Sequence, residues 1–149
     1  MLENKRTQSI RIIDCDADPF IPNKWVVDKH KRGGQFVFNL ENIRLYVSRE
    51  QKNGSILGKY IWQRLKYKRI LNACVLDYLL AHQEIIPEEW KEKEIYFLGT
   101  IYRYSEDPHS YGEAYIRYLK WDGKWLWDRR LLYHGRFYGK DLVPILNNA

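Results

Sequence analysis

Five cations and three aromatic residues are interspersed between residues 59 and 69, and these side chains are the ones best suited to binding chemistry. The cations are Lys59, Arg64, Lys66, Lys68 and Arg69, with no acidic residue between them. The aromatic residues are Tyr60, Trp62 and Tyr67. Lysine and arginine neutralise phosphates, and aromatic rings stack on bases. The stretch is therefore a candidate nucleic-acid-binding segment, although the same pattern is also typical of a solvated helix face with half-buried aromatic residues.

One further basic stretch could add to such an interface, and a separate basic turn could hold a phosphate. Arg130 and Arg136 belong to a loop-rich segment after the last aromatic strand, and we count both as candidate nucleic-acid contacts. Residues 30–34 read His-Lys-Arg-Gly-Gly, a turn whose backbone N–H groups could hold a phosphate. The lysine and hydroxyl that close a P-loop are missing, so we interpret this turn as a solvated loop, with a phosphate site as the alternative.

Alternate aspartates at Asp14, Asp16 and Asp18 suggest a hard-cation site, because carboxylate oxygens suit Ca²⁺ and Mg²⁺. The calcium-loop pattern requires glycine where Pro19 stands and glutamate where Trp25 stands. We therefore interpret the aspartates as side chains that hydrogen-bond a turn. We expect no metal and no cofactor.

Catalytic motifs such as HExxH, paired CxxC, GxSxG and GxGxxG are missing from the sequence. An enzyme would need groups that converge from distant segments, and His30, His134 and the three aspartates are the candidates. Cys74 lies in an apolar stretch where a thiol is usually inert, and we expect no disulfide to Cys15. The pattern favours a protein that is not an enzyme.

Three helices are expected from capping signals and hydrophobic periodicity. Ser55 would cap a helix over residues 56–68, and Asn72 would cap a helix over residues 73–82. Pro87 suits the first turn of a short helix, with glutamates near its positive end.

Strands are expected where apolar residues alternate with polar ones or aromatic residues are dense. They cover residues 10–14, 26–29, 35–40, 43–48 and 94–104. The strands at 35–40 and 43–48 could form a hairpin. Residues 141–146 could be a short helix or an edge strand, since Pro144 argues against a central strand.

The dipeptide Asp122-Gly123 predicts a hairpin with a two-residue turn. This register places Arg117 opposite Asp128, and opposite charges across a strand pair favour it. It also places one set of apolar side chains on a common face, namely Ala114, Ile116, Tyr118, Trp125, Trp127 and Leu131. We interpret that face as core, with an aromatic platform for bases or sugars as the alternative.

Together these elements predict an α+β fold, a single domain over residues 1–149 with residues 1–9 disordered. A largely antiparallel sheet of about five strands, including a C-terminal meander, would be covered on one face by the two central helices.

The chain has 149 residues, a net charge of +6 and a sequence pI of about 9.2. These values permit nucleic-acid binding without establishing it. The sequence contains no signal peptide and no apolar run as long as a membrane span, so we expect a soluble cytoplasmic protein without membrane contact.

Four stretches, residues 71–80, 86–90, 99–103 and 125–127, together resemble a group of small uncharacterised bacterial proteins with no assigned function. The resemblance implies a bacterial, cytoplasmic origin and carries over no catalytic or binding residue.

Three functional hypotheses follow from the sequence. The favoured one is a non-enzymatic binding or adaptor protein, whose protein partner would meet the acidic residues 84–94 or an exposed aromatic patch. The alternative is a nucleic-acid-binding module that uses the basic-aromatic segment and the loop with Arg130 and Arg136. The third is a small hydrolase or nuclease with dispersed catalytic residues.

Overall fold

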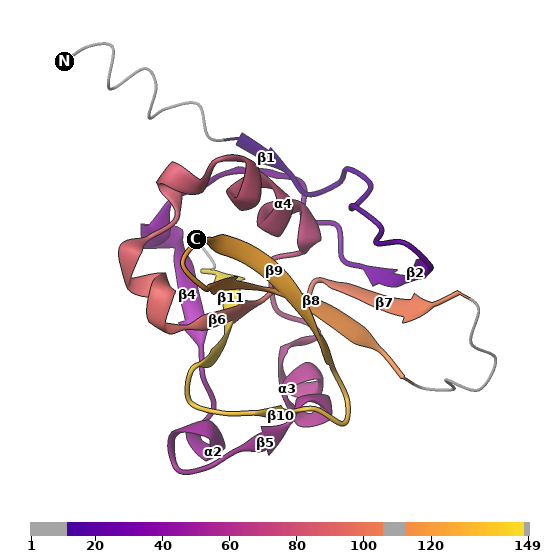
Figure 1. Ribbon diagram of the computed structural model, residues 1–149, viewed down its shortest axis with the longest axis vertical. Helices are drawn as coiled ribbons and strands as arrows, with labels where there is room; N and C mark the ends of the chain where they lie inside the picture. The colour runs from indigo at the N-terminus through magenta and orange to yellow at the C-terminus, as the bar shows by residue number, and fades with distance from the viewer. Residues whose placement is uncertain (1–11, 106–112, 148–149) are drawn as a thin grey trace.

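Aromatic and β-branched residues build the central seven-stranded sheet of the computed structural model, which describes residues 12–105 and 113–147 (Figure 1). In spatial order the strands are β2 (Trp25–His30), β7 (Thr100–Tyr104), β8 (Tyr115–Trp121), β6 (Glu94–Tyr96), β11 (Asp141–Leu146) and β4 (Ile43–Tyr46), and β9 (Trp125–Leu131) lies along β8. The fold is a single α+β domain, as predicted. The sheet has more strands than expected, and it is mixed, because β6 and β11 are parallel.

The strand expected over residues 94–104 is interrupted between β6 and β7. Gly99 lies so close to Asn72 that a Cβ on the glycine would be 2.7 Å from the Asn72 Cβ. The Gly99 N–H donates to the carbonyl of Leu71 at 3.0 Å. Both halves pair with β8 on one side. On the other side β6 pairs with β11 and β7 pairs with β2, so the break allows the sheet to curl.

The prediction that Pro144 keeps its segment at a sheet edge is wrong, because β11 has β6 on one side and β4 on the other. β6 pairs only with Asp141 and Leu142, so its pairing ends before Pro144. Pro144 lies opposite Leu45 of β4, and its carbonyl accepts the N–H of Leu71 at 3.1 Å. A proline is tolerated inside the sheet where no strand partner requires its N–H.

The prediction of a hairpin between residues 35 and 48 is also wrong. β3 (Gln35–Val37) pairs with β1 (Ile12–Asp14), whereas β4 pairs with β11. Between them the 3₁₀ helix η1 (Leu40–Asn42) turns the chain away. Two other short strands, β5 (Ile56–Leu57) and β10 (Arg136–Phe137), pair with each other.

The helix α4 (Ala73–Ala81) confirms the prediction, because Asn72 Oδ1 accepts the Cys74 N–H at 3.0 Å. A short 3₁₀ helix, η2 (Gln83–Ile85), follows α4, and η3 (Glu88–Glu92) confirms the expected helix after Pro87. The helix α3 (Gly58–Leu65) is shorter than predicted and is not capped by Ser55, because its expected first residues form β5. The helix α2 (Arg49–Lys52), which begins with a capping box, was not predicted from the sequence.

The two main helices cover opposite faces of the sheet, contrary to the expectation that both cover one face (Figure 1). Leu76 and Leu79 of α4 pack in a cluster with Ile95, whereas Ile61 of α3 packs in a second cluster with Tyr96. Successive side chains of a strand point to opposite faces, so adjacent residues of β6 belong to different cores. No helix in the described part of the chain is long and apolar enough to cross a membrane.

The hairpin between β8 and β9 exists, but its predicted register is wrong by one residue. Trp121 pairs with Trp125, so the loop has three residues and Gly123 adopts a φ of +73°. Tyr118 therefore lies opposite Asp128, and Arg117 lies opposite Arg129.

This shift moves the aromatic residues of β9 to the other face of the sheet. Trp125 and Trp127 share a face with Arg117 and not with Tyr118. Trp125 and Tyr118 are 8 % and 7 % exposed, so both faces of the hairpin contribute to core packing. The expected disorder of residues 1–9 lies outside the described residues.

Candidate nucleic-acid interface

One flank of α3 carries Lys59, Trp62 and Lys66, whose i, i+3, i+7 spacing places them on the same side of the helix. Strand β2 lies beside this flank, because the ammonium of Lys29 is 5.3 Å from the centre of the Trp62 ring. Lys29 is exposed and Trp62 is half-buried against the core. A cation from β2 therefore joins the basic segment found in the sequence.

Lys31, just after β2, anchors the end of the same helix. Its Nζ donates to the carbonyl of Lys66 at 2.6 Å and also to the carbonyl of Lys68. These carbonyls belong to the turn after α3, where a cation also interacts favourably with the helix dipole. Burial lowers the pKa of Lys31 from its usual value. Lys31 thus fixes the position of the turn that carries Tyr67.

We call this region the β2–α3 surface and define it by seven residues. They are Lys29, Lys31, Lys59, Trp62, Lys66, Tyr67 and Lys68. Within the described parts of the chain, no carboxylate oxygen lies within 4 Å of these five ammonium groups. The surface combines uncompensated positive charge with aromatic rings, the two features that backbone and base contacts require.

Arg64 lies on the other flank of α3 and is neutralised there. Its guanidinium makes a bidentate ion pair with Glu50, with one contact at 3.0 Å. Hydrogen bonding to Arg64 lowers the pKa of Glu50 to about 2. A hollow of about 400 Å³ adjoins this pair and includes Tyr60 and Arg136. Arg136 donates to the Ser55 hydroxyl at 3.1 Å, so this flank has fewer available cations.

Arg130 is part of an internal network and lies outside the β2–α3 surface. Its Nη1 is 3.0 Å from Asp141 Oδ2, and its Nη2 is 3.4 Å from Glu94 Oε1. The guanidinium also lies 5.1 Å from the centre of the Tyr96 ring. Burial raises the pKa of Asp141, which is fully enclosed. These contacts join β9, β6 and β11, which gives Arg130 a structural role.

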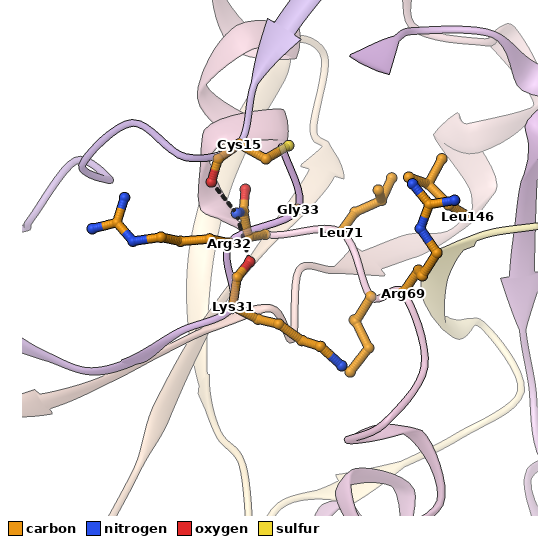
Figure 2. Close-up of a pocket in the computed structure, with 9 residues that line it drawn as sticks. Cys15, Lys31, Arg32, Gly33, Arg69, Leu71 and Leu146 are labelled. Carbon is orange, nitrogen blue, oxygen red and sulfur yellow. Dashed lines mark hydrogen bonds between the residues drawn. The ribbon is translucent and has the colours of Figure 1, made fainter. Parts of the chain in front are cut away.

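Arg69 borders a small pocket of about 120 Å³ together with Lys31, Arg32 and Gly33 (Figure 2). Figure 2 shows the three cationic side chains pointing in different directions. The remaining lining includes Ile70, Leu71 and Leu146, which are apolar. The glycine turn therefore does not gather its cations around one anion site.

The side chains of His30 and Cys74 lie near each other, but their contacts do not suit a catalytic pair. His30 Nε2 is 3.0 Å from the Ala17 carbonyl, which only accepts, so this nitrogen carries the proton. Nδ1 then accepts from the Thr100 hydroxyl at 2.9 Å. Cys74 Sγ is 3.9 Å from His30 Nε2, and burial raises the pKa of the Cys74 thiol to about 11. The contacts activate neither group as a base or nucleophile.

The aspartate loop lies beside His30 through the Ala17 carbonyl, but no carboxylate oxygen of the described residues lies within 4 Å of the His30 ring nitrogens. His134 is exposed, and Asp14 accepts the backbone N–H of Asp16 at 3.0 Å, as expected of a turn. Asp18 pairs with Arg32 at 3.7 Å. Among the residues that the structure describes, no group of three His, Cys, Asp or Glu side chains could hold a metal ion.

The surfaces expected for an adaptor are less prominent than the sequence suggested. The tryptophans of β9 lie within the core clusters or pack against them. In the acidic segment Glu88 pairs with Lys91 at 2.8 Å, and Glu94 belongs to the Arg130 network. Glu84, Glu89 and Glu92 are exposed.

Lys29 was not selected from the sequence, and Lys31 was noted only as part of the glycine turn at residues 30–34. The extended segment at 26–29 was expected, but the pattern contains no signal that places it beside a helix about thirty residues later. The sequence matches no protein-family model, no curated protein and no solved structure. The geometry of the site is therefore the basis for the proposed function.

Proposed function

We propose that this protein binds nucleic acid through the β2–α3 surface. The observation that carries the proposal is a surface on which four lysines have no carboxylate within 4 Å of their ammonium groups among the described residues, namely Lys29, Lys59, Lys66 and Lys68, while Lys31 holds the adjacent turn in place. Like charges held together repel each other, and a polyanion relieves this repulsion and releases its counterions. The aromatic rings of Trp62 and Tyr67 lie within the same surface.

The proposal is preferred to an adaptor because the aromatic residues of the hairpin are engaged in packing, whereas Tyr67 is almost fully exposed. It is preferred to a hydrolase or nuclease because both ring nitrogens of His30 are occupied by an alcohol and a backbone carbonyl. A histidine that acts as a general base needs a free ring nitrogen within reach of the proton that it removes from the substrate or water.

The test uses single charge reversals at exposed lysines of the surface. Lys29→Glu and Lys68→Glu are compared with Lys124→Glu, which makes the same charge change in the turn between β8 and β9. That turn adjoins η3, because the Lys91 ammonium of η3 lies 3.9 Å from the centre of the Trp121 ring. Binding is measured by fluorescence anisotropy with labelled oligonucleotides over a salt series.

We expect the affinity to fall as salt rises, and to be lower for Lys29→Glu and Lys68→Glu than for Lys124→Glu. Each lost phosphate contact should reduce the slope of log K against log salt by about 0.7–0.9. Equal affinities for all three variants, or binding that does not depend on salt, would overturn the proposal.

A further inference from the structure

Tyr67 is 88 % exposed, and no other large hydrophobic residue in the described parts of the chain is more than 55 % exposed. It stands between Lys66 and Lys68 in the turn that follows α3. A scattered exposed tyrosine needs no explanation by itself. Two further observations distinguish this one.

The first observation is that the backbone on both sides of Tyr67 is held in place. Lys31 Nζ donates to the carbonyls of Lys66 and Lys68. The Lys66 N–H donates to Trp62 at 2.9 Å, and the Lys68 N–H donates to Leu65 at 2.8 Å. A ring on a fixed turn loses less conformational freedom on binding than a ring on a loose loop.

The second observation is that cations accompany the rings. The Lys66 ammonium is 5.1 Å from the centre of the Tyr67 ring, and the Lys29 ammonium lies at a similar distance from Trp62. A base that stacks on such a ring brings its phosphate close to a positive charge. Stacking on a ring face and pairing with an adjacent cation are the two contacts that single-strand binders combine.

On the basis of the proposed function, we infer that the nucleic acid is single-stranded and that an unpaired base stacks on Tyr67. In a duplex the faces of the bases are covered by their neighbours and only their edges are presented in the grooves. An exposed ring on a fixed turn therefore has a ligand in a single strand and none along a duplex.

The experiment uses three labelled probes, which are a single strand of fifteen thymidines, an abasic strand with the same number of phosphates, and a duplex of similar length. Each is titrated with wild-type protein, Tyr67→Ala, Tyr67→Phe and Lys68→Glu. Tyr67 is so exposed that neither substitution at this position removes core packing.

We expect Tyr67→Ala to lower the affinity for the thymidine strand by about 5- to 150-fold and to leave its salt slope unchanged. Tyr67→Phe keeps the ring and should bind like wild type. The abasic strand and the duplex should bind equally to wild type and to Tyr67→Ala. Lys68→Glu should weaken binding of all three probes.

The two possible failures are distinct. If no probe binds in a salt-dependent manner, the proposed function itself is overturned. If the probes bind and Lys68→Glu weakens them, but Tyr67→Ala binds the thymidine strand as well as wild type does, the protein binds nucleic acid without stacking on Tyr67 and the inference fails alone.

Discussion

Arg117 Nη2 lies 2.8 Å from Asp77 Oδ1, and this salt bridge joins the centre of β8 to α4. The arginine side chain is 1 % exposed, and its guanidinium carbon lies 4.3 Å from the centre of the Trp127 ring. Asp77 supplies the only carboxylate within 4 Å of Arg117 among the described residues. A buried charge without a counter-charge is costly, so this pair explains how a buried arginine is tolerated on the sheet face that α4 covers.

Replacement of Asp77 by alanine should destabilise the protein by about 3 kcal/mol, because it leaves a buried guanidinium unpaired. The free energy of unfolding is obtained from urea denaturation at neutral pH. Glu88→Ala is the matched control, because it breaks an ion pair whose carboxylate side chain is 82 % exposed. The control should change stability by less than about 1 kcal/mol. Similar losses in both variants would contradict the assignment.

Gly58→Ala should destabilise the protein, although alanine is normally favoured over glycine in a helix by about 1 kcal/mol. A Cβ at Gly58 would lie 1.8 Å from the Leu132 carbonyl oxygen and 2.8 Å from Phe137. We expect a loss of about 1–3 kcal/mol, as in other overpacked sites. Gly54→Ala serves as the control, because its nearest neighbour, the Glu50 carbonyl oxygen, is 3.9 Å away. A rise in Tm for Gly58→Ala would show that the helix start is not packed as described.

Both thiols should be unreactive in the folded protein. Burial raises the pKa of Cys15 to about 12 and that of Cys74 to about 11, and the thiolate is the reactive form. At pH 8 iodoacetamide should alkylate the folded protein about 100-fold more slowly than the protein in denaturant. Mass spectrometry of the time course gives both rates. Rapid alkylation of folded Cys74 would instead indicate a thiolate activated by His30 and would revive the enzyme hypothesis.

Stability should fall as the pH is lowered past the ordinary pKa of histidine, and His30 should account for part of the loss. Burial lowers the pKa of His30 from 6.5, so below that pH the unfolded chain binds a proton that the folded protein does not accept as readily. The contribution is present above pH 6.5 and is lost as the pH falls through the folded pKa. Urea denaturation from pH 7.5 to pH 5 compares wild type with His30→Gln. The variant should show a smaller loss, and parallel curves would contradict this role.

Local signals determined several parts of the fold. Asn72 caps α4 because its side chain reaches an N–H only two residues away, and this contact depends on nothing distant. Asp122 and Gly123 located the β8–β9 turn for the same reason. The register was not determined, because a loop one residue longer accepts the same dipeptide and exchanges the faces of the strand.

For the candidate site, too, the sequence determined some features and the tertiary structure determined others. The sequence by itself determined that residues 59–69 are basic and aromatic, and that much of their charge has no local counterpart. Only the tertiary structure decided that Arg64 is neutralised by Glu50, that Arg130 supports the sheet, and that Lys31 fixes the turn of Tyr67. Composition and periodicity depend only on the neighbours of a residue along the chain, and they do not show which distant residues lie beside it in the folded protein. Ion pairs and shared surfaces depend on which strands pair across long separations, and packing of the whole domain selects those pairs.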